Sequence, residues 1–230
     1  LSSKTTIEVK NDKEKETIHA EKIIIATGGS PRILPGMKLD GKCIISYKKA
    51  MVLKSIPSKL IIIGSGAIGV EFAYFYNAYG TEVHLIEMLP NVLPIEDEEI
   101  SKELARNLKK LGIKIYPNTT VRKIELKNDK PQVKMERQGE VETLEGDIAL
   151  VAVGITGNIE NIGLEEIGIS TKNGFISINE YNQSSIPSIY AIGDVTGPPW
   201  LAHVASAQGH VAVEHSAGNE IKPIDYSNIP

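Results

Sequence analysis

The segment KLIIIGSGAIGVEFAYFYNAYGTEVHLIE, from Lys59 to Glu87, decides how the rest of the chain is interpreted. Its first five residues are almost wholly apolar and largely β-branched, which predicts a buried parallel strand. A GxGxxG turn follows, and then a helix-length segment that ends at Tyr79 with Gly80 beyond it. Glu82–Ile86 is a second short strand, and Glu87 closes it. This order of elements is the one that a dinucleotide-binding unit requires.

Each part of this segment has a physical role in that interpretation. Gly64 permits the tight turn, Gly66 leaves the backbone open to a pyrophosphate, and Gly69 lets the helix lie close to the strands. The helix start offers unpaired N–H groups and the positive end of its dipole to a phosphate. Glu87 is placed to accept hydrogen bonds from both ribose hydroxyls and to repel a 2′-phosphate. Because Met88 follows it rather than an arginine, the segment favours NAD over NADP.

The composition narrows the class of protein. The chain has 230 residues, of which 41% are hydrophobic and 23% charged, as in ordinary globular proteins with one large domain or two. A formal net charge of −4 gives no reason to expect nucleic acid or an anionic membrane as a partner. No long apolar run or signal peptide is visible, which predicts a soluble protein. The single cysteine, Cys43, excludes an internal disulfide and a cysteine metal cluster, and we expect no metal site.

Other elements are predicted from periodicity and turn residues. Before Lys59 we expect strands at Thr5–Val9 and Thr17–Ala20 joined by a turn at Asn11–Lys15, a buried strand within Glu21–Arg32, and a short helix at Tyr47–Leu53. After Glu87 we expect a helix at Asp97–Leu111, a third parallel strand at Ile113–Tyr116, an antiparallel meander of Val121–Leu126, Gln132–Glu136 and Val141–Leu144, and a buried strand at Asp147–Val153. The remainder should hold a polar crossover at Thr156–Glu166, short strands at Ile176–Ile178 and Ile189–Ile192, and a helix at Ala202–Ala217. In the helix Asp97–Leu111, one face carries Ile100, Leu104, Leu108 and Leu111.

Two further motifs flank the nucleotide unit, IIIATGGSPR at Ile23–Arg32 and IYAIGDVTGPPWLAH at Ile189–His203. With GSGAIGVEF between them, the sequence resembles the two-dinucleotide flavoprotein disulfide reductases over essentially all its residues. The tracts VLPIEDEEISKEL and VAVGITGN are similar to the members that oxidise dihydrolipoamide. The resemblance implies an α/β protein with a Rossmann-like three-layer FAD/NAD(P)-binding fold and an antiparallel β-meander. It implies an NAD-binding domain at 48–156, inserted in a partial FAD-binding domain formed by 1–47 and 157–230.

The resemblance also implies which residues contact the two cofactors. Asp194 would bond a ribityl or ribose hydroxyl of FAD, and the helix start at Leu201, Ala202 and His203 would lie under the flavin pyrimidine ring. Such a helix start stabilises the negative charge of a reduced flavin. Glu71 would approach the nicotinamide carboxamide. The implied FAD contacts are Thr27, Gly28, Gly29, Asp194, Leu201, Ala202 and His203. The implied NAD contacts are Gly64, Ser65, Gly66, Ala67, Ile68, Gly69, Glu71, Glu87, Val121 and Gly154.

The function implied by the resemblance is oxidation of dihydrolipoamide, carried on the lipoyl domain of a 2-oxoacid dehydrogenase complex, with reduction of NAD⁺ by way of a redox disulfide and FAD. A homodimer and a location in a bacterial cytoplasm or mitochondrial matrix go with it. The family's CxxxxC pair, its first GxGxxG and its C-terminal dimerisation domain with a His–Glu pair are not in this sequence, which opens on Leu1. We therefore expect a piece of a longer protein that binds NAD without turnover, binds FAD poorly and holds no catalytic residue. Family members often have arginine where Ile155 follows Gly154.

Two other functions stay open at this point. One is a sibling flavoprotein reductase acting on peroxide, oxygen, ferredoxin, mercuric ion or glutathione, although Glu87 argues against the NADPH-preferring branch. The other is a stand-alone NAD-binding module, against which the two flavin motifs count, since such a module has no need of them.

Overall fold

The computed structural model describes residues 1–11 and 14–229, which form two compact units. One unit consists of Leu1–Ser30 and Ile155–Pro230, and the other of Pro31–Gly154. The resemblance implies domain boundaries at 47/48 and 156/157, whereas these units divide at 30/31 and 154/155. The difference at the first boundary arises because Ile44–Ser46 forms strand β5, which pairs in parallel with β12 (Ile148–Val151) and so joins the sheet of the second unit.

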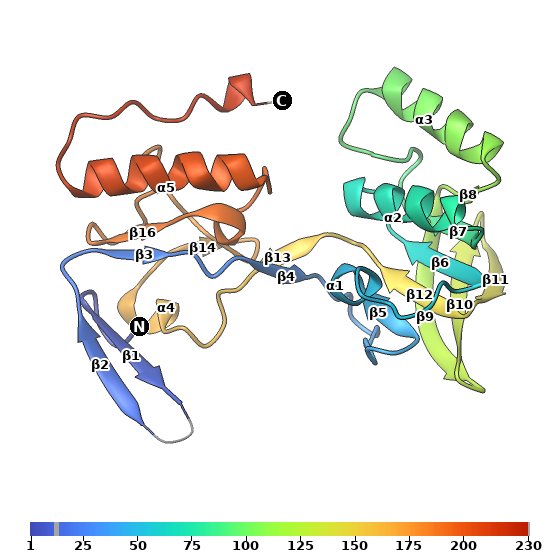
Figure 1. Ribbon diagram of the computed structural model, residues 1–230, viewed down its shortest axis with the longest axis horizontal. Coiled ribbons are helices and arrows are strands. Elements are labelled where there is room, and N and C mark those ends of the chain that lie inside the picture. Colours follow the sequence, from blue (N-terminus) through green and yellow to red (C-terminus); the bar gives the residue numbers. More distant parts are fainter. Residues whose placement is uncertain (12–13, 230) are drawn as a thin grey trace. The chain divides into compact units, whose positions relative to one another are not determined.

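The Pro31–Gly154 unit is built on a five-stranded parallel sheet (Figure 1). Its strand order is β5-β12-β6-β7-β8, where β6 is Lys59–Ile63, β7 is Glu82–Ile86 and β8 is Lys114–Tyr116. The helices are α1 (Tyr47–Ala50), α2 (Ala67–Ala78) and α3 (Glu98–Lys110). Three antiparallel strands form a separate sheet in the order β11-β10-β9: β9 (Thr119–Lys127), β10 (Lys130–Arg137) and β11 (Glu140–Glu145).

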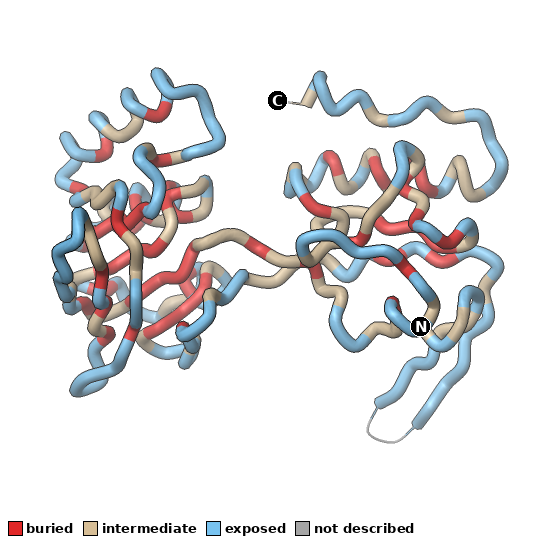
Figure 2. The backbone as a smooth tube through the Cα atoms, turned by 180° about the vertical axis from the view of Figure 1, so that it is seen from behind, coloured by how far each residue is buried: buried red, intermediate tan, exposed pale blue. Residues whose placement is uncertain are grey.

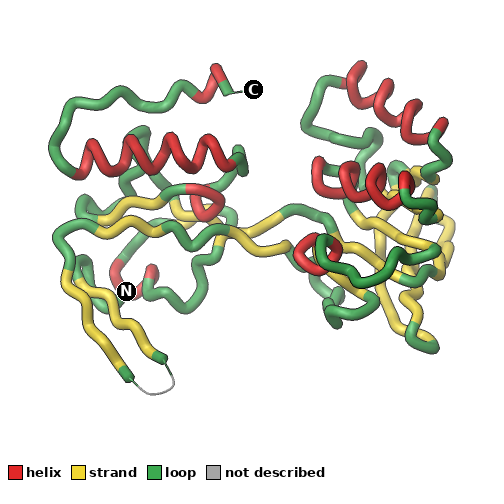
Figure 3. The backbone as a smooth tube through the Cα atoms, in the orientation of Figure 1, coloured by secondary structure: helices red, strands yellow, loops and turns green. Residues whose placement is uncertain are grey.

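Both faces of the parallel sheet are covered, which explains the unbroken apolar run of β6. Leu60 and Ile62 belong to a core shared with α2 and α3, whereas Ile61 and Ile63 belong to a core shared with β9 and β10. All four of these side chains are at most 4% exposed. Helices, parallel sheet and meander therefore make the three layers that the sequence predicts (Figure 3).

The unit formed by Leu1–Ser30 and Ile155–Pro230 is assembled from short paired strands and one long helix. The pairs are β1 (Thr6–Lys10) with β2 (Lys15–His19), β3 (Ile23–Ile25) with β16 (Ile189–Ala191), β4 (Gly29–Pro31) with β13 (Ile155–Gly157), and β14 (Thr171–Lys172) with β15 (Phe175–Ile176). Its helices are α4 (Leu164–Ile167), α5 (Ala202–Ser216) and the 3₁₀ helices η1 (Gly193–Thr196) and η2 (Tyr226–Asn228). The β3–β16 pair is parallel, so two segments more than 160 residues apart in the sequence lie side by side.

Several predicted elements differ from those observed. The helix expected at Tyr47–Leu53 ends at Ala50, and the expected crossover contains β13 and α4. The strand within Glu21–Arg32 is short, and Ile24 is 37% exposed. Positions 12 and 13 of the turn expected at Asn11–Lys15 lie outside the described residues.

The predicted apolar face of α3 is only partly buried. Leu108 is 2% exposed, but Ile100 is 61% and Leu111 51% exposed. Helix α3 therefore contacts the hydrophobic core through Leu104, Ala105 and Leu108, and Figure 2 shows most of its backbone as exposed. The predicted ends are nearly as observed: Asp97 caps the first turn by accepting from the N–H groups of Glu99 and Ile100, and Leu111 is the C-cap.

Candidate functional site

The turn after β6 requires glycine at two positions for reasons of space. Gly64 has φ +99°, and a Cβ placed there would lie 2.4 Å from the carbonyl oxygen of Ala152. A Cβ on Gly69 would lie 2.0 Å from the carbonyl oxygen of Gly64. Both approaches are shorter than van der Waals contact, so no other residue fits without moving backbone. This agrees with the tight turn and close helix packing that the GxGxxG pattern predicts.

Gly66 lies in a different environment. It is the N-cap of α2, with no side-chain cap, and a Cβ on it would meet nothing within 4 Å. Its φ of −67° is one that any residue adopts. The first N–H groups of a twelve-residue helix are thus left next to open space, which is where an anion is stabilised by the helix dipole.

Glu87 is held against this turn by three hydrogen bonds. Its Oε2 accepts from the N–H and the hydroxyl of Ser65, each at 2.8 Å, and its Oε1 accepts from the N–H of Leu89 at 2.9 Å. The residue is 7% exposed. A carboxylate has about four acceptor positions, so three bonds leave one, on Oε1. In this arrangement one further hydroxyl can donate to Glu87, and a second can do so only if the Ser65 hydroxyl turns away.

A cavity of about 450 Å³ opens beside these residues. Six of the predicted NAD contacts line it: Gly64, Ser65, Gly66, Glu87, Val121 and Gly154. Four do not line it. Gly69 lies under the turn, Glu71 is exposed on α2, and Ala67 and Ile68 are the first residues of that helix. The volume lies within the range of small-molecule sites, which is about 300–1,000 Å³.

Sequence reasoning did not identify two groups that line this cavity. Arg32 is an exposed cation beside it, and its backbone N–H donates to the carbonyl of Gly154 at 3.0 Å. Thr119 is buried, and its N–H donates to the carbonyl of Glu87 at 2.8 Å. Neither lies in the Lys59–Glu87 segment, and only the fold brings them to it. The one sequence signal that could have identified either residue was Arg32 itself, at the end of the IIIATGGSPR motif.

The residues predicted to contact FAD form a second group in the other unit. The Thr27 hydroxyl donates to the carbonyl of Asn158, and the Asn158 amide donates to the carbonyl of Thr27, both at 2.8 Å. The Asn158 N–H donates to the carbonyl of Gly28 at 2.9 Å. A Cβ on Gly29 would lie 3.3 Å from the Cβ of Asp194. The ATGG and GD motifs are therefore neighbours, with Asn158 as a connecting residue that the sequence did not suggest.

Gln208 on α5 fixes the turn that carries Asp194. Its Oε1 accepts from the N–H of Gly193 at 2.6 Å, and its Nε2 donates to the hydroxyl of Tyr226 at 3.0 Å. The side chain is 4% exposed, so these bonds are made away from water. Sequence reasoning missed Gln208, because a lone glutamine in a helix carries no motif. The Asp194 carboxylate is half-buried and, in the described part of the chain, accepts no hydrogen bond from another residue.

Helix α5 begins where the resemblance places the flavin ring. Leu201 is its N-cap, without a side-chain cap, and Ala202 and His203 are exposed in the first turn. The helix is fifteen residues long, so its dipole is fully developed at this end.

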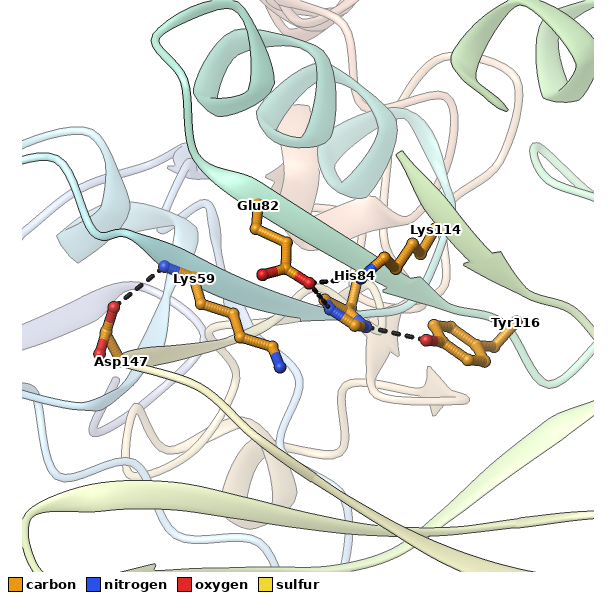
Figure 4. A network of polar contacts seen from close by, with 6 residues as sticks. All are labelled: Lys59, Glu82, His84, Lys114, Tyr116 and Asp147. Carbon is orange, nitrogen blue, oxygen red and sulfur yellow. Dashed lines mark hydrogen bonds and ion pairs between the residues drawn. The ribbon is translucent and has the colours of Figure 1, made fainter. Parts of the chain in front are cut away.

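A separate polar network connects β7 and β8 (Figure 4). His84, 3% exposed, contacts the hydroxyl of Tyr116 through Nδ1 and Glu82 through Nε2, both at 2.9 Å. Lys114 donates to the same Glu82 oxygen at 2.5 Å. Because a carboxylate only accepts, Nε2 carries the proton, and Nδ1 of a neutral imidazole accepts from Tyr116. None of its members lines the cavity beside Gly66, so the network lies outside that cavity.

This network predicts a pH dependence of stability. Burial lowers the pKa of His84 below its usual 6.5, while its bond to Glu82 acts in the opposite direction. The unfolded chain therefore binds more protons than the folded one below pH 6.5, and the stability present above that pH is lost as the pH falls. We expect the free energy of urea unfolding to decrease from pH 7.5 to 5.5 with a slope of at most about 1.4 kcal/mol per pH unit.

The matched variant is His84→Gln, which retains polar contacts but does not titrate. It should be less stable at pH 7.5 and have a flatter pH profile, whereas an unchanged slope would assign the effect to other groups. Lys114, followed by His84, lowers the pKa of Glu82 to about 2, so that group loses its contribution only below pH 4.5. The Glu82 contribution should be small, since its side chain is 45% exposed.

Within residues 1–11 and 14–229, no group of three or more His, Cys, Asp or Glu side chains is arranged to hold a metal ion. Among the helices of the same residues, none is long and apolar enough to cross a membrane.

Comparisons with known proteins give consistent results. Residues 2–209 match the family described as pyridine nucleotide-disulphide oxidoreductase. A dihydrolipoyl dehydrogenase of Rhizobium etli is 43% identical over 223 residues, which are 96% of this chain and 46% of that protein. The dihydrolipoyl dehydrogenase of Bacillus subtilis is 41% identical over 236 residues, covering 100% of this chain and 49% of the relative. The chain thus spans about half the length of the curated relatives it matches.

Solved structures agree with the sequence comparisons. LpdA from Mycobacterium tuberculosis superposes with a TM-score of 0.87 at 31% identity, covering 95% of this chain and 47% of that one. The HOCl-induced flavoprotein disulfide reductase RclA from Escherichia coli has a TM-score of 0.86 at 26% identity, covering 97% of this chain and 50% of that one.

Proposed function

The chain belongs to the pyridine nucleotide-disulphide oxidoreductase family, and on that premise we propose that the cavity beside Gly66 binds NAD(H). One observation carries the proposal: the uncapped start of α2 and the buried carboxylate of Glu87 lie on the same cavity. The helix start suits a pyrophosphate and the remaining acceptor position of Glu87 suits a ribose hydroxyl. Arg32, on the same cavity, supplies a cation for the phosphates.

The second part of the proposal concerns FAD. Two features of the other unit fit that cofactor: a half-buried Asp194 carboxylate that can accept from a hydroxyl, and the uncapped start of α5. When bound, the flavin supplies hydride transfer to or from a nicotinamide. Thr27, Gly28 and Gly29 would contact the adenosine side of FAD, and Leu201, Ala202 and His203 would hold the helix start near its pyrimidine ring. Gln208 is a positioning residue, because it acts on the site through the Gly193 N–H.

For the whole protein we propose oxidation of a dithiol of the dihydrolipoamide type, with reduction of NAD⁺. The dithiol gives up two electrons and two protons; NAD⁺ takes a hydride and one proton goes to solvent. The names of the relatives support this substrate. The 230 residues contain a single cysteine and therefore no redox-active pair. By themselves they should bind NAD(H) without oxidising dihydrolipoamide. Homodimer formation and a cytoplasmic or mitochondrial location stay predictions.

A second candidate is a flavoprotein disulfide reductase with another substrate. The observation in its favour is that RclA, an HOCl-induced flavoprotein disulfide reductase, shares the fold with a TM-score of 0.86. The two candidates share both cofactor proposals and differ in the disulfide substrate. Assays of a complete, flavin-loaded protein with dihydrolipoamide and NAD⁺ discriminate them.

The direct test of the nucleotide proposal is a titration of residues 1–230 with NADH, followed by nicotinamide fluorescence. We expect saturable binding, with NADPH at least tenfold weaker because of Glu87. Gly66→Asp should weaken NADH binding at least tenfold, since a carboxylate would occupy the open space at the helix start, while Tm stays close to that of the parent protein.

Ala78→Asp is the matched control, because it also adds a carboxylate to α2 but at an exposed position outside the cavity. Equal loss of affinity in both variants, or no binding of NADH at all, would refute the assignment of the cavity.

A further inference from the structure

A second cavity borders the segment that leads from β7 to α3. It has a volume of about 580 Å³ and is bounded by Pro90–Val92, by one side of α3, and by Ile115 and Pro117 at the end of β8. We call it the α3 groove. Among the described residues, the α3 groove and the cavity beside Gly66 share no lining residue.

The rim of the α3 groove is strongly basic. Lys102, Arg106, Lys109 and Lys110 line it, and no carboxylate of the described chain does. Three of these cations, Lys102, Arg106 and Lys109, are spaced i, i+4 and i+7, so α3 presents them on one face. Since the whole chain has a net charge of −4, this concentration of positive charge is local.

Two of these cations are paired, but only with carboxylates of the same helix that do not line the groove. Lys102 lies 2.7 Å from Glu98, and Arg106 lies 3.3 Å from Glu103. The four side chains are between 56% and 67% exposed. Exposed pairs of this kind contribute about 0.3–0.5 kcal/mol on a helix, so an incoming anion can replace them at small cost.

The floor of the α3 groove is apolar. Val92 is 2% exposed, and Ala105 and Ile115 are partly buried and pack against the same core. Pro90 and Pro117 complete this surface. A ligand that fits therefore has an uncharged, flat body for the floor and a strongly anionic end for the rim, since lysine and arginine bind phosphate through charge-assisted hydrogen bonds.

We propose that the α3 groove binds a nucleoside phosphate, with the base and sugar on the apolar floor and the phosphates between Lys102, Arg106 and Lys109. The volume suits one small molecule, being within the range of about 300–1,000 Å³ for such sites. A nucleic acid strand fits less well, because the positive charge is confined to one side of one helix on an acidic chain. The proposal is independent of NAD binding, which uses different residues.

The test must separate the two cavities, because a nucleotide could enter either one. We would titrate ¹⁵N-labelled protein with ATP at low salt and follow backbone amide signals. Signals of Asn91, Ala105 and Ile115 report the α3 groove, whereas those of Gly66 and Val121 report the other cavity. We expect saturable shifts at the first set that persist when NADH is present in excess.

The charge variant is K102Q/R106Q/K109Q, which keeps good helix formers on α3. It should weaken the ATP response of the α3 groove at least tenfold. The matched control K48Q/K127Q/K134Q removes three exposed lysines elsewhere and should change it less than twofold. Inorganic pyrophosphate should bind at least tenfold more weakly than ATP, because it cannot use the apolar floor.

Three results would overturn the proposal: shifts confined to Gly66 and Val121, equal weakening by both triple variants, or pyrophosphate binding as tightly as ATP. The first would leave the nucleotide in the cavity beside Gly66 only. The second would mean that the ATP response depends on the overall charge of the protein and not on the three cations of α3. The third would make the α3 groove a site for simple anions.

Discussion

Gly64→Ala should abolish the stable fold of the Pro31–Gly154 unit or reduce its stability by at least about 3 kcal/mol. Two costs add at this position. The φ of +99° is strained for any residue with a Cβ, and that Cβ would meet the Ala152 carbonyl oxygen at 2.4 Å. Ala152 directly follows β12 in the centre of the core, and its N–H donates to the carbonyl of Ile63, so neither backbone segment can move freely.

Gly69→Ala should reduce stability by a comparable amount, but only because of a steric clash and not because of backbone strain. Its φ is ordinary for a helix, but the added methyl would lie 2.0 Å from the Gly64 carbonyl oxygen. Gly66→Ala is the control, with φ −67° and no atom within 4 Å of the added Cβ. It should cost about 1 kcal/mol or less, the difference between glycine and alanine at an N-cap.

Thermal and urea unfolding followed by circular dichroism would compare the three variants. The order of stability should be parent, then Gly66→Ala, then Gly69→Ala and Gly64→Ala well below. If Gly64→Ala and Gly66→Ala unfold at the same urea concentration, the prediction that a Cβ at position 64 clashes with the Ala152 carbonyl oxygen is wrong.

The Lys59–Glu87 segment was predictable because its elements are local. Strands β6 and β7 have the bounds that the apolar runs indicate, and Gly80 follows the C-cap of α2 with φ +88°. Periodicity, glycine geometry and chain order all act over fewer than thirty residues, and each favours the same structure.

Features that depend on distant segments were not predictable in this way. Nothing in the sequence of Ile44–Ser46 says that it pairs with β12, and this pairing moves the unit boundary. Ile100 has helical periodicity with Leu104 and Leu108, yet α3 meets the core with only part of its length. Arg32 and Gln208 reach their sites through tertiary structure, so no spacing rule applies to them.

Glu87→Gln should weaken NADH binding by about tenfold to a hundredfold, the range for a hydrogen bond to a charged group, about 1.5–3 kcal/mol. The exchange removes the anionic acceptor proposed for a ribose hydroxyl. It also places an amide NH₂ or a weaker carbonyl acceptor opposite the N–H groups of Ser65 and Leu89. NADPH binding should fall less, since repulsion of the 2′-phosphate is removed at the same time. Glu87→Arg should shift this preference further.

Ser65→Ala tests the contribution of the Glu87 carboxylate separately from that of the turn that holds it. Ser65 is fully buried, and its hydroxyl is one of three donors to Glu87, so the variant should lose about 1 kcal/mol of stability. It leaves the charge in place and frees a second acceptor position on Oε2, now able to receive the other ribose hydroxyl. NADH affinity should therefore be unchanged or rise. A loss of affinity as large as that of Glu87→Gln would mean that the turn, and not the carboxylate, selects the nucleotide.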